Sequence, residues 1–157
     1  MTAADKGTGN LFDMDYQRID PQRWNVLSSK IAIFKSAHVC KETGIVLHRL
    51  RNMASKGIVY IYLWELEAIT RFLTREFDSV RDPRDVVPFI RKARSGRLCH
   101  ATGIKRTRII YSVLQDRGAL RQSEIDTILS YVKTQKEDLH RELNVVYPAA
   151  KERNGRY

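Results

Sequence analysis

The sequence predicts a mainly helical, all-α fold built from two copies of one helical unit. Sliding the chain by 59 positions places residues 36–73 over residues 95–132 without a gap. Eight of these 38 pairs are identical, where ordinary composition would give roughly two or three. The identical pairs are Ser36/Ser95, Cys40/Cys99, Thr43/Thr102, Gly44/Gly103, Ile45/Ile104, Arg49/Arg108, Glu65/Glu124 and Ile69/Ile128. A unit of roughly 50–60 residues buries only a marginal core, so we expect the two copies to pack together.

The second observation is the pattern of apolar residues at helical spacing on both sides of each Thr-Gly-Ile step. It predicts paired helices over residues 95–101 and 104–114 in one copy and over the equivalent residues of the other copy. Residues 27–34 and 86–92 are expected to supply the preceding helix of each copy, and residues 63–72 and 122–132 the following one, with the last extended to 143. The chain therefore divides into a flexible arm (1–19), repeat one (20–78), repeat two (79–143) and a basic tail (144–157).

The first helix of each repeat has a recognisable start. Asp20-Pro21 opens one and Asp82-Pro83 opens its counterpart, because aspartate caps helix N-termini and proline suits the first helical position.

One segment interrupts the helical pattern. The run at 58–64, Ile-Val-Tyr-Ile-Tyr-Leu-Trp, is β-branched and aromatic and predicts a short strand. Two interpretations stay open for its aromatic side chains. They pack in the core beneath the two copies, or they form a wing strand or a dimer seam.

Each copy places a glycine, Gly44 or Gly103, where a tight turn between two helices needs a residue with positive φ. A cysteine lies four positions earlier, Cys40 or Cys99, where a small side chain allows two helices to cross closely. We therefore interpret both cysteines as buried core residues rather than as redox or disulfide-forming groups.

An apolar residue, Leu50 or Ile109, follows six positions after each glycine and closes the same crossing. The position nine after the glycine is Met53 in one copy but Ser112 in the other, so Val113 is expected to replace the serine there. Over about twenty residues per copy, this spacing resembles the helix-turn-helix of phage-repressor-type (Xre/Cro-like) DNA-binding proteins. For a single copy, an ordinary αα-corner with a glycine turn is the alternative interpretation.

The resemblance implies that the second helix of each unit enters the DNA major groove. In repeat two the implied base-contacting residues are Lys105, Arg106, Thr107, Arg108 and Tyr111, with Lys92, Arg94 and Arg97 as phosphate contacts. In repeat one the corresponding face carries Val46, Leu47, His48, Arg51 and Asn52. Because that face is less polar, it contacts DNA weakly or binds protein, and we prefer protein.

The charge distribution supports a nucleic-acid partner. The net charge is +10, and residues 1–78 carry a net +2 whereas residues 79–157 carry +8. A basic surplus in one half is typical of a protein that binds a polyanion, although it also occurs as a solubilising surface.

Several functional classes are not expected. The histidines and cysteines lack zinc-ligand spacing, and no nucleophile or acid–base set is recognisable, so we expect no metal, no cofactor and no enzymatic activity. Neither a membrane span nor a signal peptide is indicated, so we expect a cytoplasmic protein without membrane contact.

The leading hypothesis is a bacterial or phage-borne, sequence-specific transcriptional regulator that binds double-stranded DNA chiefly through repeat two. We expect a homodimer through repeat one and the 58–64 segment, with two chains on an inverted repeat. The alternatives are one chain on two dissimilar half-sites, a protein-binding adaptor or inhibitor, and a non-specific nucleic-acid binder.

Overall fold

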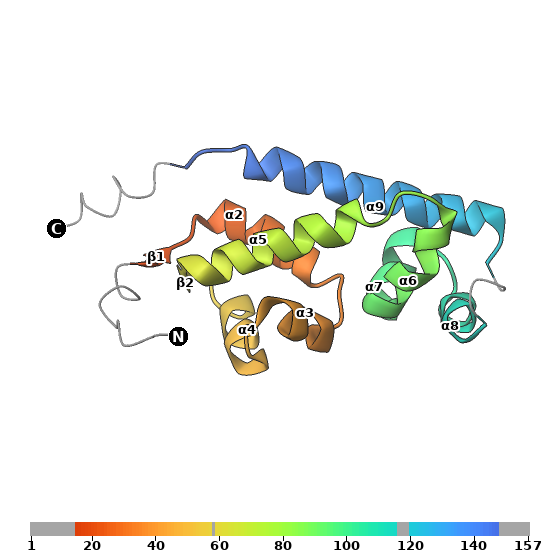
Figure 1. Cartoon of the computed structure of the whole chain (residues 1–157), viewed down its shortest axis with the longest axis horizontal. Coiled ribbons are helices and arrows are strands. Elements are labelled where there is room, and N and C mark those ends of the chain that lie inside the picture. Colours follow the sequence, from red (N-terminus) through yellow and green to blue (C-terminus); the bar gives the residue numbers. More distant parts are fainter. Residues whose placement is uncertain (1–14, 58, 116–119, 148–157) are drawn as a thin grey trace.

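The computed structural model describes residues 15–57, 59–115 and 120–147, and in this part the chain is mainly helical, as the sequence predicts (Figure 1). Repeat one comprises β1 (Tyr16–Arg18), α2 (Pro21–Ile31), α3 (Ser36–Thr43), α4 (Leu47–Ala54), β2 (Tyr60–Tyr62) and α5 (Leu63–Asp78). Repeat two comprises the 3-10 turn η1 (Pro83–Asp85), α6 (Val86–Lys92), α7 (Ser95–Thr102), α8 (Arg106–Leu114) and α9 (Gln122–Leu143).

The two repeats contain the same succession of helices at the predicted offset. The helices α3, α4 and α5 each begin 59 residues before α7, α8 and α9, respectively. The repeat seen in the sequence is therefore a repeat of structure.

Both predicted helix starts are present. The Asp20 carboxylate accepts a hydrogen bond from the Gln22 backbone N–H at 2.9 Å. The Asp82 carboxylate accepts one from the Arg84 N–H at 3.0 Å. The second start differs in detail, because Asp82 opens the short η1 turn, which leads directly into α6.

The predicted strand is present as β2, and it pairs antiparallel with β1, so that Tyr16 lies opposite Tyr62. The contact with the β2 segment extends one residue beyond β1. The Ile19 N–H donates to the Val59 carbonyl at 3.0 Å, and the Ile19 side chain is buried. The prediction of a flexible arm over residues 1–19 is therefore wrong for residues 16–19. The rest of the predicted arm, residues 1–14, and the end of the basic tail, residues 148–157, lie outside the described residues.

The long helix α9 connects the repeats. It packs against α2 and α5 of repeat one and against α6 and α7 of repeat two. In Figure 1 it runs along the top of the molecule, with α3 and α4 below α5 and with α7 and α8 below the other part of α9.

The hydrophobic core is continuous across the two repeats. At its centre the buried Phe34 ring contacts Phe72 and Phe77 of repeat one and Phe89 of repeat two, with ring centroids 5.3–5.8 Å apart. The expected packing of the copies against each other is therefore confirmed.

The repeats also meet through a reciprocal backbone contact. The Lys35 N–H donates to the Lys92 carbonyl at 2.9 Å, and the Arg94 N–H donates to the Ile33 carbonyl at 2.7 Å. The two hydrogen bonds are equivalent to each other. At the offset of 59, residues 33 and 35 of repeat one correspond to residues 92 and 94 of repeat two. This reciprocity gives the contact a local two-fold relation between equivalent residues of the repeats.

Candidate nucleic-acid interface

The turn between the paired helices has the same geometry in both repeats. Gly44 has φ 79° and ψ 3°, and Gly103 has φ 76° and ψ 4°, which is the left-handed region. A Cβ atom at either glycine would meet nothing within 4 Å. The glycines are thus needed for the backbone conformation and not for space.

The threonine before each glycine fixes the turn from within. The Thr43 hydroxyl donates to the Val39 carbonyl at 2.7 Å and accepts from the Ile45 N–H at 3.2 Å. Thr102 makes the equivalent bonds in repeat two, at 2.7 and 3.3 Å. This shared network sets the direction in which α4 and α8 leave the turn.

An arginine–glutamate pair then holds each of these two helices against the helix that follows it. Arg49 of α4 binds Glu65 of α5 through Nε and Nη2, at 2.9 and 2.8 Å. Arg108 of α8 binds Glu124 of α9 in the same way, at 2.8 and 2.6 Å. Such bidentate pairs fix geometry strongly. The Arg108 guanidinium lowers the pKa of Glu124 to about 2.

The start of α8 presents a basic, exposed surface. Lys105 is the N-cap, Arg106 and Thr107 follow in the first turn, and all three side chains are exposed. Tyr111, one turn further, is also exposed, and Arg97 is exposed on the neighbouring α7. In a helix-turn-helix these positions face the DNA.

Three other predicted contact residues are engaged within the protein. Arg108 is held by Glu124. Lys92 pairs with the buried Glu76 at 3.2 Å, and Arg94 donates through Nε to the Phe34 carbonyl and through Nη2 to the Ser36 hydroxyl, at 2.9 and 2.5 Å. These side chains join repeat two to itself or to repeat one, and we leave them out of the contact set proposed below.

The corresponding start of α4 is exposed but much more apolar. Val46 is 66% exposed and Leu47 37%, and His48, Arg51 and Asn52 are exposed as well. Both faces predicted from sequence are therefore on the surface, and they differ in chemistry.

The aromatic run divides between the two interpretations given for it. Ile61 is fully buried, whereas Tyr60 is 41% and Trp64 45% exposed. The Tyr16 ring lies 5.8 Å from Tyr60 and 4.6 Å from Tyr62, which makes a small aromatic surface on the two strands beside α4. The run thus contributes apolar side chains to the core and aromatic side chains to the surface.

Two details of the predicted packing are wrong. Cys40 and Cys99 are free thiols at matching positions, but they are only half-buried, because the preceding Val39 and Leu98 occupy the core. In repeat two, Ser112 stays in the core position nine after the glycine.

The Ser112 hydroxyl donates to the Ile109 carbonyl at 2.6 Å, and this hydrogen bond allows the polar serine side chain to be fully buried. Val113, expected to replace the serine, is only partly buried.

Other sites are not evident in the described part of the chain. Residues 15–57, 59–115 and 120–147 hold no group of three or more histidine, cysteine, aspartate or glutamate side chains arranged to bind a metal ion. None of the helices in these ranges combines the length and the hydropathy that a bilayer crossing requires.

Comparison of the chain with protein-family models, with curated proteins and with solved structures finds no match. Sequence reasoning missed the roles of Arg49 and Arg108, although both residues and both glutamate partners are identical pairs in the repeat.

Proposed function

We propose that this protein is a sequence-specific, double-stranded-DNA-binding regulator that acts in the cytoplasm through its two helix-turn-helix units. The observation that supports this most directly is the start of α8, where Lys105, Arg106 and Thr107 are exposed directly after a helix-turn-helix glycine. Arginine and lysine donate to guanine O6 and N7, and threonine contacts base edges or a thymine methyl group. We assign the main recognition helix to α8.

The test measures binding to a DNA site selected from a random pool. Arg106→Ala should weaken binding to that site by about 1–3 kcal/mol while changing binding to random duplex much less, because base contacts carry specificity. Lys133→Ala is the matched control, since Lys133 is an exposed basic residue on α9 that is not among the residues expected to contact DNA. Equal losses for both variants on both DNAs would contradict a recognition role for Arg106.

A salt series separates specific from non-specific binding. Contacts to phosphates make affinity fall steeply with salt whatever the sequence. If the selected site and random duplex bind equally over the whole series, the protein is a non-specific nucleic-acid binder.

A second candidate function is a protein contact through repeat one, including a homodimer. The specific observation is that large apolar side chains are exposed at two helix starts of repeat one, Val46 and Leu47 at the start of α4 and Leu63 and Trp64 at the start of α5. Large apolar patches on soluble proteins commonly mark interfaces. Sedimentation of the wild type and of Leu47→Glu tests it. A dimer that the substitution abolishes supports the contact, and a monomer at all concentrations contradicts the homodimer.

A further inference from the structure

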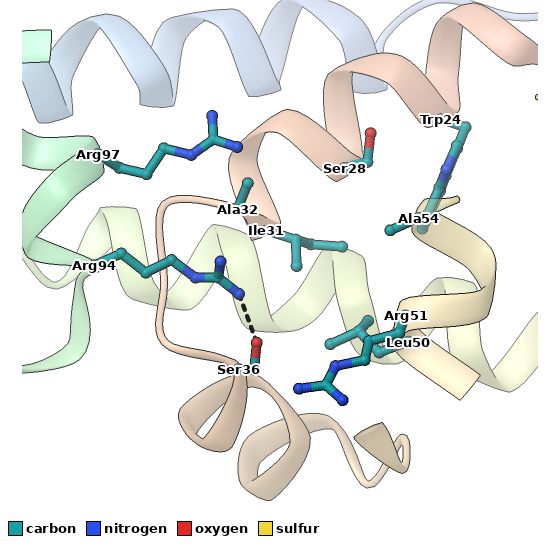
Figure 2. A pocket seen from close by; sticks show the side chains of 10 residues that line it. All are labelled: Trp24, Ser28, Ile31, Ala32, Ser36, Leu50, Arg51, Ala54, Arg94 and Arg97. Atoms are coloured by element: carbon teal, nitrogen blue, oxygen red, sulfur yellow. Dashed lines mark hydrogen bonds between the residues drawn. The ribbon is translucent and has the colours of Figure 1, made fainter. Parts of the chain in front are cut away.

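A hollow of about 220 Å³ lies where repeat one meets the start of α7 (Figure 2). Figure 2 shows the side chains of Arg51 from α4, of Arg94 from the position just before α7, and of Arg97 from α7 at this hollow. We call it the arginine-lined hollow. Its other lining residues are Trp24, Ser28, Ile31, Ala32, Ser36, Leu50 and Ala54.

Small side chains create this hollow, and repeat two lacks them. Ser28 and Ala54 line the space between α2 and α4. At the offset of 59 their counterparts are the larger Val87 and Val113. In repeat two the first helix, α6, packs directly against α8, whereas α2 packs chiefly against α9 and α5. The hollow is therefore a feature of repeat one and not of the shared unit.

The hollow is strongly basic. Arg51, Arg94 and Arg97 line it, no acidic residue does, and none of these arginines forms an ion pair with a carboxylate in the ranges that the structure describes. Arg94 is held in place by its bonds to the Phe34 carbonyl and the Ser36 hydroxyl. A guanidinium fixed in this way is organised in advance to bind an oxyanion.

The base of the hollow is apolar. Trp24, Ile31 and Leu50 are between 5% and 8% exposed. A phosphate of the DNA backbone would use the arginines but not this apolar base.

We propose that the arginine-lined hollow binds a small organic anion, with its phosphate or carboxylate group on the arginines and its apolar body against Trp24, Ile31 and Leu50. A site of this kind combines an apolar surface with a few polar groups that fix orientation. The inference does not depend on DNA binding, and its test uses the full chain without DNA.

The test is calorimetric titration with phenyl phosphate, inorganic phosphate and benzyl alcohol. Phenyl phosphate carries both the oxyanion and the apolar ring, so it should bind at least about tenfold more tightly than either of the other two. Equal binding of phenyl phosphate and inorganic phosphate would indicate an oxyanion contact such as the DNA backbone offers, and it would overturn the proposal. So would the absence of saturable binding of phenyl phosphate at millimolar concentration.

Variants assign the binding to the hollow. Arg51→Gln and Arg97→Gln should each weaken phenyl phosphate binding about tenfold. Both side chains are exposed, so these substitutions leave the hydrophobic core unchanged. Arg71→Gln removes an equally exposed arginine of α5 that does not line the hollow, and it should bind as the wild type does. Equal affinities in all three variants would place the binding elsewhere.

A filling variant tests the apolar base without changing charge. Ser28→Val introduces the residue that repeat two has at this position. It should retain the melting temperature of the wild type and lose phenyl phosphate binding. Ala54→Val, at the end of α4, gives a second filled hollow if the first variant does not fold. A folded, filled variant that binds like the wild type would overturn the proposal.

Discussion

At the scale of single residues, the two turn glycines and the two arginine–glutamate pairs hold α4 and α8 in place. Gly103 ends α7 with φ 76°, and Arg108 then fixes α8 to Glu124 at the start of α9. The glycine sets the direction in which the chain leaves α7, and the arginine–glutamate pair sets the position of α8 against α9. Each can be tested by one substitution.

Gly103→Ala should destabilise the fold by about 1–2 kcal/mol, because a side chain disfavours the left-handed conformation. The open space around Gly103 leaves backbone strain as the cause. Gly96→Ala is the control, since Gly96 lies within α7 and also has open space around its Cβ position. Urea unfolding should show a loss for the first variant and no loss for the second. Equal effects would mean that the positive φ carries no cost.

Glu124 should make stability depend on pH in the acid range. Its pKa in the folded protein is about 2, below the ordinary value of 4.5, chiefly because Arg108 donates to the carboxylate. A lowered pKa stabilises the fold at pH values above the unfolded-state pKa, and this contribution disappears as the pH falls from 4.5 towards 2.

In Glu124→Gln, the free energy of unfolding should be lower than in the wild type at neutral pH, and the difference should shrink towards pH 2. Glu137→Gln, an exposed change on the same helix, should show no such convergence. If the free energies of unfolding of Glu124→Gln and the wild type differ by the same amount from neutral to acid pH, the ionised Glu124 does not stabilise the fold through Arg108.

At the scale of elements, the C-terminal half of α9 ties repeat two to the first helix of repeat one. Arg23 of α2 donates to the buried Glu142 carboxylate at 2.9 Å, to the Glu142 carbonyl at 2.8 Å and to the Val145 carbonyl at 2.7 Å. Nearby, the buried Lys30 donates to Gln135 at 2.7 Å. This contact places α2 against α9.

Arg23→Met should lower the free energy of unfolding by about 2–3 kcal/mol, because it leaves the Glu142 carboxylate buried with a weaker set of partners. Arg141→Met removes a largely exposed arginine that pairs with Asp138 on the same helix, and it should cost less than about 0.5 kcal/mol. Denaturant unfolding of the two variants compares them directly. Similar losses would show that the contact between α2 and α9 contributes little.

At the scale of the whole molecule, the repeat in the sequence predicted what is shared between the halves and missed what differs. Helix order, turn glycines and the strand follow from local patterns. The pairing of Arg108 with Glu124 could not be predicted in this way, because the two are separated by 16 positions in the chain and meet only after folding. The strand β1 could not be predicted locally, because it pairs with β2, more than 40 residues later in the chain. The arginine-lined hollow arises where equivalent residues of the two repeats differ in size, whereas the repeat was recognised from the residues that are the same.

The reciprocal contact around Phe34 and Ala93 bears on how the chain would meet DNA. It relates the repeats by a local two-fold axis, and α4 and α8 are fixed to their repeats by the same turn and the same arginine–glutamate pair. We expect this local relation to extend to α4 and α8, so that one chain would present the starts of both helices to DNA in opposite senses. This favours one chain per site over the two-chain complex expected from sequence.

We predict that a single chain protects two inverted half-sites about one helical turn apart, since paired helix-turn-helix units place their recognition helices about 34–36 Å apart. The half-sites should differ in sequence, because α4 begins with Leu47-His48 and α8 with Arg106-Thr107. Footprinting together with native mass spectrometry of the complex measures protection and stoichiometry. His48→Ala should weaken protection of one half-site and Arg106→Ala that of the other. Two chains on a symmetric inverted repeat, with both variants affecting both half-sites alike, would instead establish the homodimer through repeat one.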